Sequence, residues 1–277
     1  DLAGIHLLEL HLHRLQVLMS LGRYSQVVDA CSRAQVLLER VLPSWGEFFR
    51  TTLHMEGAYC AVYLDPRPET AGRLLESLEP VDLPGTMRFI ARSVRGELEL
   101  TRGNVRTAAL IQRVSLRYAG NWRSILGSGS QWELYILSMC LVTDVELSPD
   151  DAVELDARAV RARATSLLRE ILSDPAPLQR DIPTLMAFAA AVGLSAVAAE
   201  DAGSDRRAVG GELVATALAV GTNQTCRLLS HDYLRSRTER LDARALAQAE
   251  ERIRSLDRGG LVAHAADLAG RLAGEVG

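Results

Sequence analysis

Lysine is absent from this chain: all 31 basic residues among its 277 are arginine. A phosphate-binding loop of the GxxxxGK[ST] type needs a lysine, so this class of ATP site is excluded. Uniform arginine beside abundant Ala, Leu, Val and Gly is typical of a GC-rich genome and predicts an actinobacterial source. Because the bias runs along the whole chain, it does not by itself mark an anion site.

Cysteine motifs and long apolar runs are also missing. The four cysteines are Cys31, Cys60, Cys140 and Cys226. Each lies in an apolar stretch, where a thiol behaves as a small hydrophobic group, and no CxxC pair or Cys/His cluster indicates zinc. No apolar run reaches the roughly 20 residues that span a bilayer. We therefore expect reduced cysteines, a cytoplasmic location, no membrane contact and no metal.

The charge balance bears on the class of partner. The 31 arginines are outnumbered by 35 acidic residues, which gives a formal net charge of -4. Such a chain has no overall attraction for phosphate backbones, and its nearly neutral end at 268–277 lacks a basic recognition helix. We expect no direct contact with nucleic acid. The first residue, Asp1, resembles neither a signal peptide nor an initiator, which predicts a piece of a longer protein.

A helix-turn-helix pattern recurs along the chain. One copy begins at Leu21-Gly22-Arg23-Tyr24 and another at Arg102-Gly103-Asn104-Val105. Each joins two apolar helices through a glycine turn and continues with apolar or small residues three or four positions apart. This spacing keeps one helix face toward a neighbour. Repetition of such a unit predicts a helical solenoid, an architecture that serves as a binding surface.

Breaking and capping residues predict the helices of the first 120 residues. Ser44 and Glu47 form a capping-box pattern, and Pro66 with Pro68 forces a turn. The second helix of each pair needs a small or slim residue where it approaches the first; these are Val27, Ala71 and Ala108, somewhat farther apart than the roughly 34 residues of a tetratricopeptide unit. The expected helices are 5–21, one ending near 41, 45–64, 69–78, 85–101 and one ending near 118.

The second half of the chain predicts further helices. Glycine and serine at 127–130 predict a flexible turn, and Gly120-Asn121-Trp122 an interruption. Ser148 as cap and Pro149 at the first helical position predict one long helix to about 172. Two of these helices should form a pair whose connecting loop lies around Gly203. The remaining expected helices are 132–142, 183–200, 206–220, 242–256 and 261–273.

Together these patterns predict an all-α fold, a right-handed α-solenoid of about six or seven tetratricopeptide-like helix pairs. Each unit needs only its neighbours to bury its apolar face, so we expect one domain over 1–277. Its repeats are clearer in 1–120 and divergent in 121–222, and C-terminal helices occupy 223–277.

The stretch 243–273 resembles a known family. It contains Leu246, Ala249, Ile253, Leu256 and Gly259-Gly260-Leu261, and is similar to the last repeat of large actinobacterial regulators of the MalT/LuxR type. In that family an ATPase module, a tetratricopeptide-like superhelix and a DNA-reading helix-turn-helix follow one another. The resemblance implies that this chain is the effector-sensing superhelix, without the other two modules. The first 120 residues resemble the family only as generic repeats.

Three groups of polar residues suit structural roles better than chemistry. The first helix carries His6, His11 and His13, of which the first two are five residues apart and face different ways. Cys226, His231 and Asp232 likewise diverge on a helix, and no nucleophile-elbow turn precedes the cysteine. Helix capping and the helix dipole explain the acidic run of Asp150, Asp151, Glu154 and Asp156.

Aromatic residues make up only 5% of the chain, so their placement is informative. If the first helices of successive pairs line a concave face, five side chains converge on one groove: Phe48, Tyr59, Arg88, Arg92 and Trp132. Arginine forks there suit a carboxylate or phosphate, and aromatic rings suit an apolar or sugar face. The alternative is ordinary packing between repeats, where large rings fill gaps.

These patterns favour a non-catalytic binding and regulatory module that needs no cofactor. We expect its groove to recognise a peptide, a protein or a small-molecule effector and to transmit occupancy by shifting a conformational population. Ordering of the turn at 127–130 is one physical route. The alternative is a protein-protein scaffold, including a homodimer, with no small-molecule ligand. A helical enzyme with a cryptic pocket is a third class, but no site motif supports it.

Overall fold

The computed structural model describes most of the chain, and its regular elements there are helices, with no strand among the described residues. This confirms the all-α prediction. The described residues are 2–21, 23–41, 53, 58, 69–76, 85–126, 131–173, 182–199, 203–224 and 227–274. Most of the helix expected over 45–64 lies outside them, as do Gly22 and the turn at 127–130.

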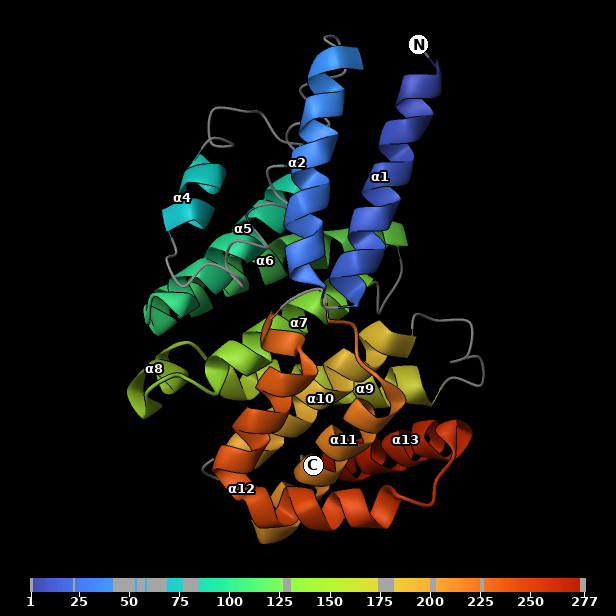
Figure 1. The fold of residues 1–277 in the computed structure, drawn as a ribbon. Helices are drawn as coiled ribbons and strands as arrows, with labels where there is room; N and C mark the ends of the chain where they lie inside the picture. Colours follow the sequence, from blue (N-terminus) through green and yellow to red (C-terminus); the bar gives the residue numbers. More distant parts are fainter. Residues whose placement is uncertain are drawn as a thin grey trace. The chain divides into compact units, whose positions relative to one another are not determined.

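The helices match most of the expected ranges (Figure 1). In chain order they are α1 (Leu2–Ser20), α2 (Tyr24–Val41), α4 (Glu69–Glu76), α5 (Gly85–Thr101), α6 (Val105–Leu126), α7 (Gln131–Asp144), α8 (Pro149–Glu154), α9 (Ala157–Leu172), α10 (Ile182–Ala198), α11 (Ser204–Val220), the 3-10 turn η2 (Arg227–Leu229), α12 (His231–Ile253) and α13 (Arg258–Gly274).

The chain divides into two compact units. The first comprises Asp1–Ile111 with Gln224–Cys226, and the second comprises Gln112–Asn223 with Arg227–Gly277. The single repeat domain over 1–277, and its solenoid arrangement, stay predictions.

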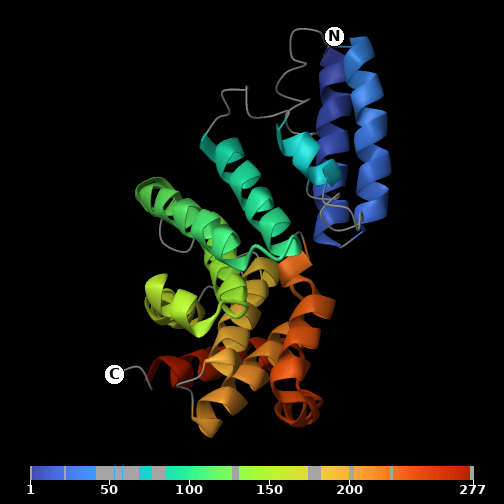
Figure 2. The same ribbon diagram turned by 90° about the vertical axis from the view of Figure 1, so that its left-hand side faces the viewer.

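In the first unit, α1 and α2 run side by side, as Figures 1 and 2 both show. The small or slim positions predicted for the second helix of each pair, Val27, Ala71 and Ala108, are fully buried. Between α5 and α6 the chain turns at Gly103, whose φ of 82° lies in the left-handed region that favours glycine. The glycine turn expected between these two helices is confirmed.

The interruption expected at Gly120-Asn121-Trp122 is wrong, because α6 continues through it to Leu126. A glycine inside a helix costs only about 1 kcal/mol relative to alanine. Glycine lowers helix propensity but keeps its backbone N–H donor, whereas proline has none. The 22-residue α6 therefore outlasts the predicted end near 118.

In the second unit, α10 and α11 form the centre of the core. Every α10 residue from Leu185 to Val197 is buried, and α10 packs on α7 and α11. A Cβ added at Gly193 would lie 2.6 Å from the carbonyl oxygen of Gly210 on α11, so two glycines permit this close approach. Within the described ranges, no helix combines the length and apolar character that a bilayer crossing requires.

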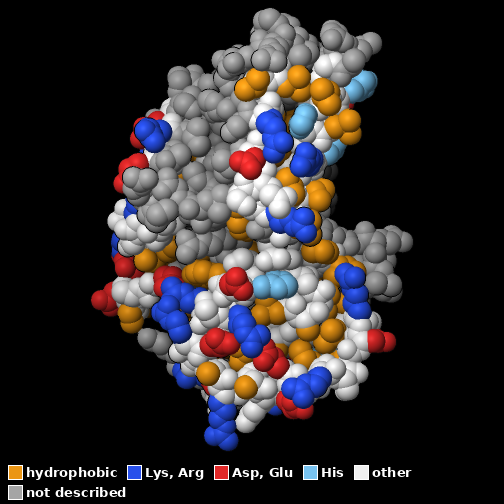
Figure 3. Space-filling model, in the orientation of Figure 1, with side chains coloured by type: hydrophobic (Ala, Val, Ile, Leu, Met, Phe, Trp, Pro, Cys, Tyr) orange, Lys and Arg blue, Asp and Glu red, His pale blue; other side chains and the backbone are white. Residues whose placement is uncertain are grey.

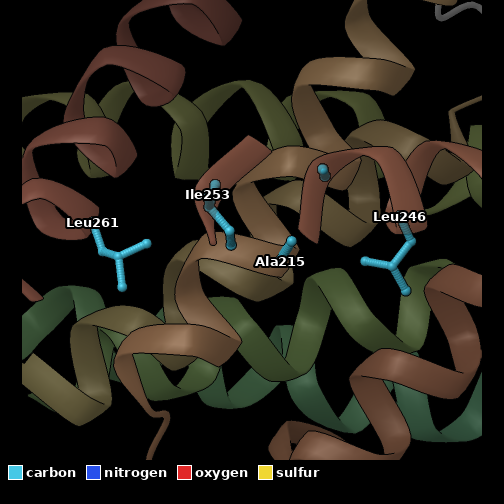
Figure 4. Close-up of a cluster of buried hydrophobic side chains, with 5 residues drawn as sticks. Ala215, Leu246, Ile253 and Leu261 are labelled. Carbon is cyan, nitrogen blue, oxygen red and sulfur yellow. The ribbon is translucent and has the colours of Figure 1, made fainter. Parts of the chain in front are cut away.

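The last two helices close this core. Leu246 and Ile253 of α12 pack with Leu261 of α13 and Ala215 of α11 (Figure 4). Figure 1 shows α12 bending partway along its length. At the bend Asp242 has non-helical φ and ψ of -159° and 81°. Its carboxylate accepts a hydrogen bond of 2.9 Å from the Ala245 amide and so caps a new helix, which explains the helix start predicted at 242.

Candidate functional site

The helix predicted from Ser148 to about 172 breaks in two, and the break shapes a cavity. Ser148 caps α8 as predicted, because its hydroxyl accepts from the Asp151 amide at 3.2 Å. The first segment ends at Glu154, however, and Asp156 adopts a left-handed φ of 53°. Its carboxylate then caps α9 by accepting from the Ala159 amide at 3.4 Å. The prediction of a single helix was wrong. Asp156 ends the first segment and caps the second, because an aspartate tolerates left-handed backbone and is a favourable N-cap.

Arg113 of α6 holds both ends of the connecting segment. Its terminal nitrogens donate to the two carboxylate oxygens of Asp144, at 2.8 and 3.0 Å. Its Nε donates to the Leu155 carbonyl oxygen at 2.7 Å. Both charged side chains are largely buried, at 12% and 7% exposed. Burial raises the pKa of Asp144, although the hydrogen bonds and charge of Arg113 oppose this shift. Arg113 thus fixes α8 between the end of α7 and the start of α9.

A cavity of 510 Å³ lies against this clamped segment. Its polar wall consists of Asp144, Asp156, Arg158, Arg161 and Ser195. The apolar wall comes from the segment around α8 and from the end of α10, and includes Leu147, Pro149, Ala152, Val153, Ala198 and Ala199.

The cavity reaches the surface at α8. Val153 lines it and is 83% exposed, and α8 has no buried residue. By contrast, Ser195 and Ala199 of the opposite wall are buried in the core. One wall is therefore part of the buried core, whereas the other is a short helix that the core does not cover.

The protonation state of one thiol bears on the chemistry near this cavity. Cys140 of α7 is fully buried, and this burial, reinforced by Asp144, raises the pKa of its thiol to about 12. A thiol that stays protonated at neutral pH is a poor nucleophile. In the part of the chain that the structure describes, no group of three His, Cys, Asp or Glu residues is placed to hold a metal ion.

The five residues of the predicted groove are only partly described. Phe48 and Tyr59 lie outside the described residues. Arg88 lies on α5 and Trp132 on α7, but their side chains are not among those described. Arg92 is half-buried on α5. The convergence of these five residues on one groove stays a prediction.

A second cluster of titratable groups joins three helices. Glu212 of α11 accepts from Arg252 of α12, at 3.0 Å from Nε and 2.7 Å from a terminal nitrogen. Its other oxygen lies 2.9 Å from Nε2 of His264 on α13. Burial acts to raise the pKa of Glu212, but the hydrogen bonds from Arg252 and His264 outweigh it and lower the pKa. The cluster stabilises the packing of α12 and α13 on α11.

His231 also has a structural contact. Its Nε2 lies 3.1 Å from the Thr222 amide nitrogen and accepts its hydrogen, which fixes the residues after α11. Burial lowers the pKa of His231, although the charge of Asp232 opposes the shift. Cys226, its candidate partner in a nucleophilic arrangement, lies outside the described residues. Of the three histidines of α1, His6 and His13 are exposed, and His6 Nδ1 lies 3.2 Å from Glu9 Oε2.

Sequence reasoning missed the site that the structure brings together. Arg113 and Asp144 are 31 residues apart, and no local pattern joins them. No local pattern distinguished Arg158 and Arg161 from the other arginines. Asp156 carried the available signal, because a cap-forming residue stood in the middle of a helical pattern. Neither a protein-family model, nor a curated protein, nor a solved structure matches this chain.

Proposed function

We propose that this chain is a non-catalytic binding and regulatory module whose ligand occupies the cavity between α8, α9 and α10. The observation that carries the proposal is the cavity itself. Its volume of 510 Å³ falls within the about 300–1,000 Å³ of small-molecule sites. Its wall combines apolar residues with a few convergent polar groups, the composition typical of such sites.

Regulation follows from the unequal walls of the cavity. A ligand that binds one arrangement of α8 more tightly than another shifts the population toward it. Because α8 has no buried residue, it contributes little packing energy of its own. Contacts with a ligand can therefore shift the equilibrium between its arrangements. In this proposal ligand binding orders α8, whereas the sequence had suggested that it orders the turn at 127–130.

We further propose that the chain is the effector- or partner-sensing superhelix of a bacterial transcriptional regulator, similar to the MalT/LuxR type. The helix pair α10–α11 supports this context, as does the turn before α13. There the Asp257 carboxylate accepts from the Gly260 amide at 2.7 Å. In this proposal the pairs wind into a right-handed solenoid in the cytoplasm, where the buried thiols of Cys31 and Cys140 stay reduced.

A specific observation favours the alternative function, a protein-protein scaffold. Four apolar side chains of α1 and the residue after it are exposed: Leu7, Leu10, Val17 and Leu21. They are three, seven and four positions apart, which places them along one side of the helix. Figure 3 shows hydrophobic and histidine side chains gathered over α1. Such a stripe suits a protein partner or a second copy of the chain.

A thermal-shift screen of the chain against metabolites and nucleotides, with sedimentation velocity on the same sample, tests the proposal. A ligand in 100-fold excess over its Kd stabilises the folded state by about 2.7 kcal/mol, enough to raise Tm by several degrees. We expect one compound class to give a saturable shift that Ala198→Leu, which fills the cavity, removes. Reversal of Arg88 and Arg92 to Glu tests the groove separately, because an anionic ligand held there would bind more weakly.

The alternative gives a different result. A concentration-dependent dimer, or capture of a defined protein that Leu10→Glu abolishes, together with no shift from any compound, would make the chain a scaffold and contradict the proposed ligand site. The exposed Leu241 of α12 serves as a matched control position, because Leu241→Glu also replaces an exposed leucine by a carboxylate, on a helix other than α1.

A further inference from the structure

The exposed apolar side chains of α1 belong to a heptad pattern. Five residues lie alternately three and four positions apart: Leu7, Leu10, Arg14, Val17 and Leu21. The four apolar ones are exposed. This is the spacing of the a and d positions of a coiled coil, with Arg14 at the central a position. We call these five residues the α1 seam. Leu21 follows the last residue of α1, but its amide donates to the Val17 carbonyl oxygen at 3.1 Å and so continues the helical pattern.

A different face of α1 packs within the first unit. Leu15, Leu18 and Met19 are at most 7% exposed, and α1 lies beside α2. The helix is therefore held by its own packing, and a partner helix would meet a seam that is already formed. Only the partner then loses conformational freedom on binding, which lowers the cost of association.

Arg14 gives the seam a positive charge that no described residue neutralises. It is exposed and forms no ion pair within the described ranges. The α1 sequence contains one acidic residue, Glu9, whose Oε2 lies 3.2 Å from His6 Nδ1. Glu9 occupies a c position of the heptad, outside the seam. A charge at an a position selects the partner and register of a coiled coil, so the seam favours a helix that places a carboxylate opposite Arg14.

A second copy of the chain fits the seam poorly. Two copies of α1 paired about the middle of the seam would bring two Arg14 guanidinium groups together, and neither copy has a carboxylate in the seam. The exposed His6 and His13 border the seam at g positions, where coiled coils carry the charges that choose a partner. They supply no negative charge. Figure 3 shows basic and histidine side chains beside the hydrophobic ones over α1.

A lipid surface is also a poorer occupant than a helix. Helices that lie in a membrane surface have a broad apolar face with bulky side chains and many cations on the other face. The α1 seam is confined to a and d positions, the narrow stripe of a coiled coil, and has a cation within it.

We propose that the α1 seam binds an acidic amphipathic helix of a partner protein, with apolar heptad residues of the partner on Leu10 and Val17 and a carboxylate on Arg14. Apolar burial supplies affinity, and the ion pair supplies selectivity. This inference names the partner of the surface on which the alternative function rests. It involves α1 only and does not depend on a ligand in the cavity.

Fluorescence anisotropy of labelled peptides with the full chain tests the assignment. The probes are two synthetic amphipathic helices of three heptads, both with leucine at a and d. One carries glutamate at e and g, and the other carries lysine there. We expect the glutamate peptide to bind at least about tenfold more tightly, because opposite charges attract across an interface and like charges repel. Added salt should weaken its binding, since exposed charges are screened.

Charge reversal at Arg14 separates selectivity from apolar burial. Arg14→Glu should weaken binding of the glutamate peptide by about tenfold or more and strengthen binding of the lysine peptide. As the matched control, Arg244→Glu reverses an exposed arginine of α12 and should change neither Kd. Leu10→Glu puts a charge into the apolar part of the seam and should abolish binding of the glutamate peptide. Circular dichroism checks that each variant stays folded.

Sedimentation velocity tests the exclusion of a second copy. We expect the natural chain to be monomeric at the concentrations used for anisotropy. Arg14→Leu makes the seam apolar throughout, so we expect this variant to form a concentration-dependent dimer. A monomeric Arg14→Leu chain would overturn the selectivity assigned to Arg14.

Several results would overturn the inference as a whole: equal binding of the two peptides, binding of neither, a dimer of the natural chain that Leu10→Glu dissociates, or binding to phosphatidylserine vesicles in place of the peptide. The cavity is tested separately, because a saturable thermal shift that Ala198→Leu removes does not involve α1. Failure of the peptide to bind therefore leaves the proposed ligand site standing, and failure of every ligand to bind leaves the seam standing.

Discussion

At the scale of single residues, loss of the Arg113 side chain would leave the buried charge of Asp144 without a partner. Its guanidinium neutralises Asp144, and both side chains are largely buried. Removing one partner of a buried ion pair costs about 3–5 kcal/mol, because the other charge stays buried. We expect Arg113→Met to lower the free energy of unfolding by about this amount in urea denaturation.

The paired variant separates lost charge from lost packing. Arg113→Met together with Asp144→Leu replaces the ion pair by apolar side chains, so we expect it to regain much of the stability that Arg113→Met loses. If the double variant is as unstable as the single one, the contribution of Arg113 comes from its other hydrogen bond, to Leu155, or from packing.

His231 makes stability depend on pH. It accepts a hydrogen bond from the Thr222 amide and is therefore neutral in the folded state, with a pKa that burial lowers below the ordinary 6.5. The unfolded chain takes up the proton at higher pH than the folded chain. The contribution of His231 is therefore complete above pH 6.5 and is lost as pH falls through and below that value.

Urea denaturation at pH 7.5 and pH 5.5 measures this effect. His231→Gln keeps an acceptor without a titrating group, so we expect the natural chain to lose more stability between the two pH values than this variant does. Equal losses would show that other groups cause the pH dependence.

At the scale of elements, the contact between α10 and α11 depends on two glycines. A Cβ at Gly193 would lie 2.6 Å from the Gly210 carbonyl oxygen and 3.0 Å from Cγ2 of Val214. Backbone cannot move aside as a flexible side chain does. Although alanine favours helix by about 1 kcal/mol over glycine, we expect Gly193→Ala to destabilise the protein by about 1–3 kcal/mol.

Gly270 of α13 is the matched control for this substitution. A Cβ added there meets nothing within 4 Å, so only helix propensity acts. We expect Gly270→Ala to stabilise the protein by up to about 1 kcal/mol in the same denaturation experiment. If both variants were stabilised, the two helices would separate at little cost and the close packing would not matter.

At the scale of the whole molecule, we expect stability to be unevenly distributed. The α10 stretch from Leu185 to Val197 and the α11 stretch from Val209 to Ala217 are buried throughout, whereas α8 has no buried residue. Amides of the first two should exchange only through large opening, and those of α8 through local opening. Hydrogen exchange read by mass spectrometry should find the slowest peptides in α10 and α11, and equal protection in α8 would contradict this expectation.

The sequence predicted the helices better than it predicted the site. Gly103 ends a helix by adopting positive φ, and Ser148 and Asp242 cap helices by accepting from amides three residues ahead. These interactions lie within a few residues, so a pattern reveals them. The break at Asp156 depends on two signals that compete: an apolar periodicity that continues, and a capping residue within it. Local propensity did not decide between them.

By itself the sequence determined an all-α chain, the bounds of most helices, and the slim buried positions at Val27, Ala71 and Ala108. Each depends on side-chain spacing or on caps within one or two turns. Only the tertiary structure decided that Arg113 would reach Asp144 and Leu155, and that the end of α10 would face the Arg158 side of α9. Contacts across 30 or more residues depend on how whole helices pack, and the many similar arginines of this chain give no local sign of which one will be buried.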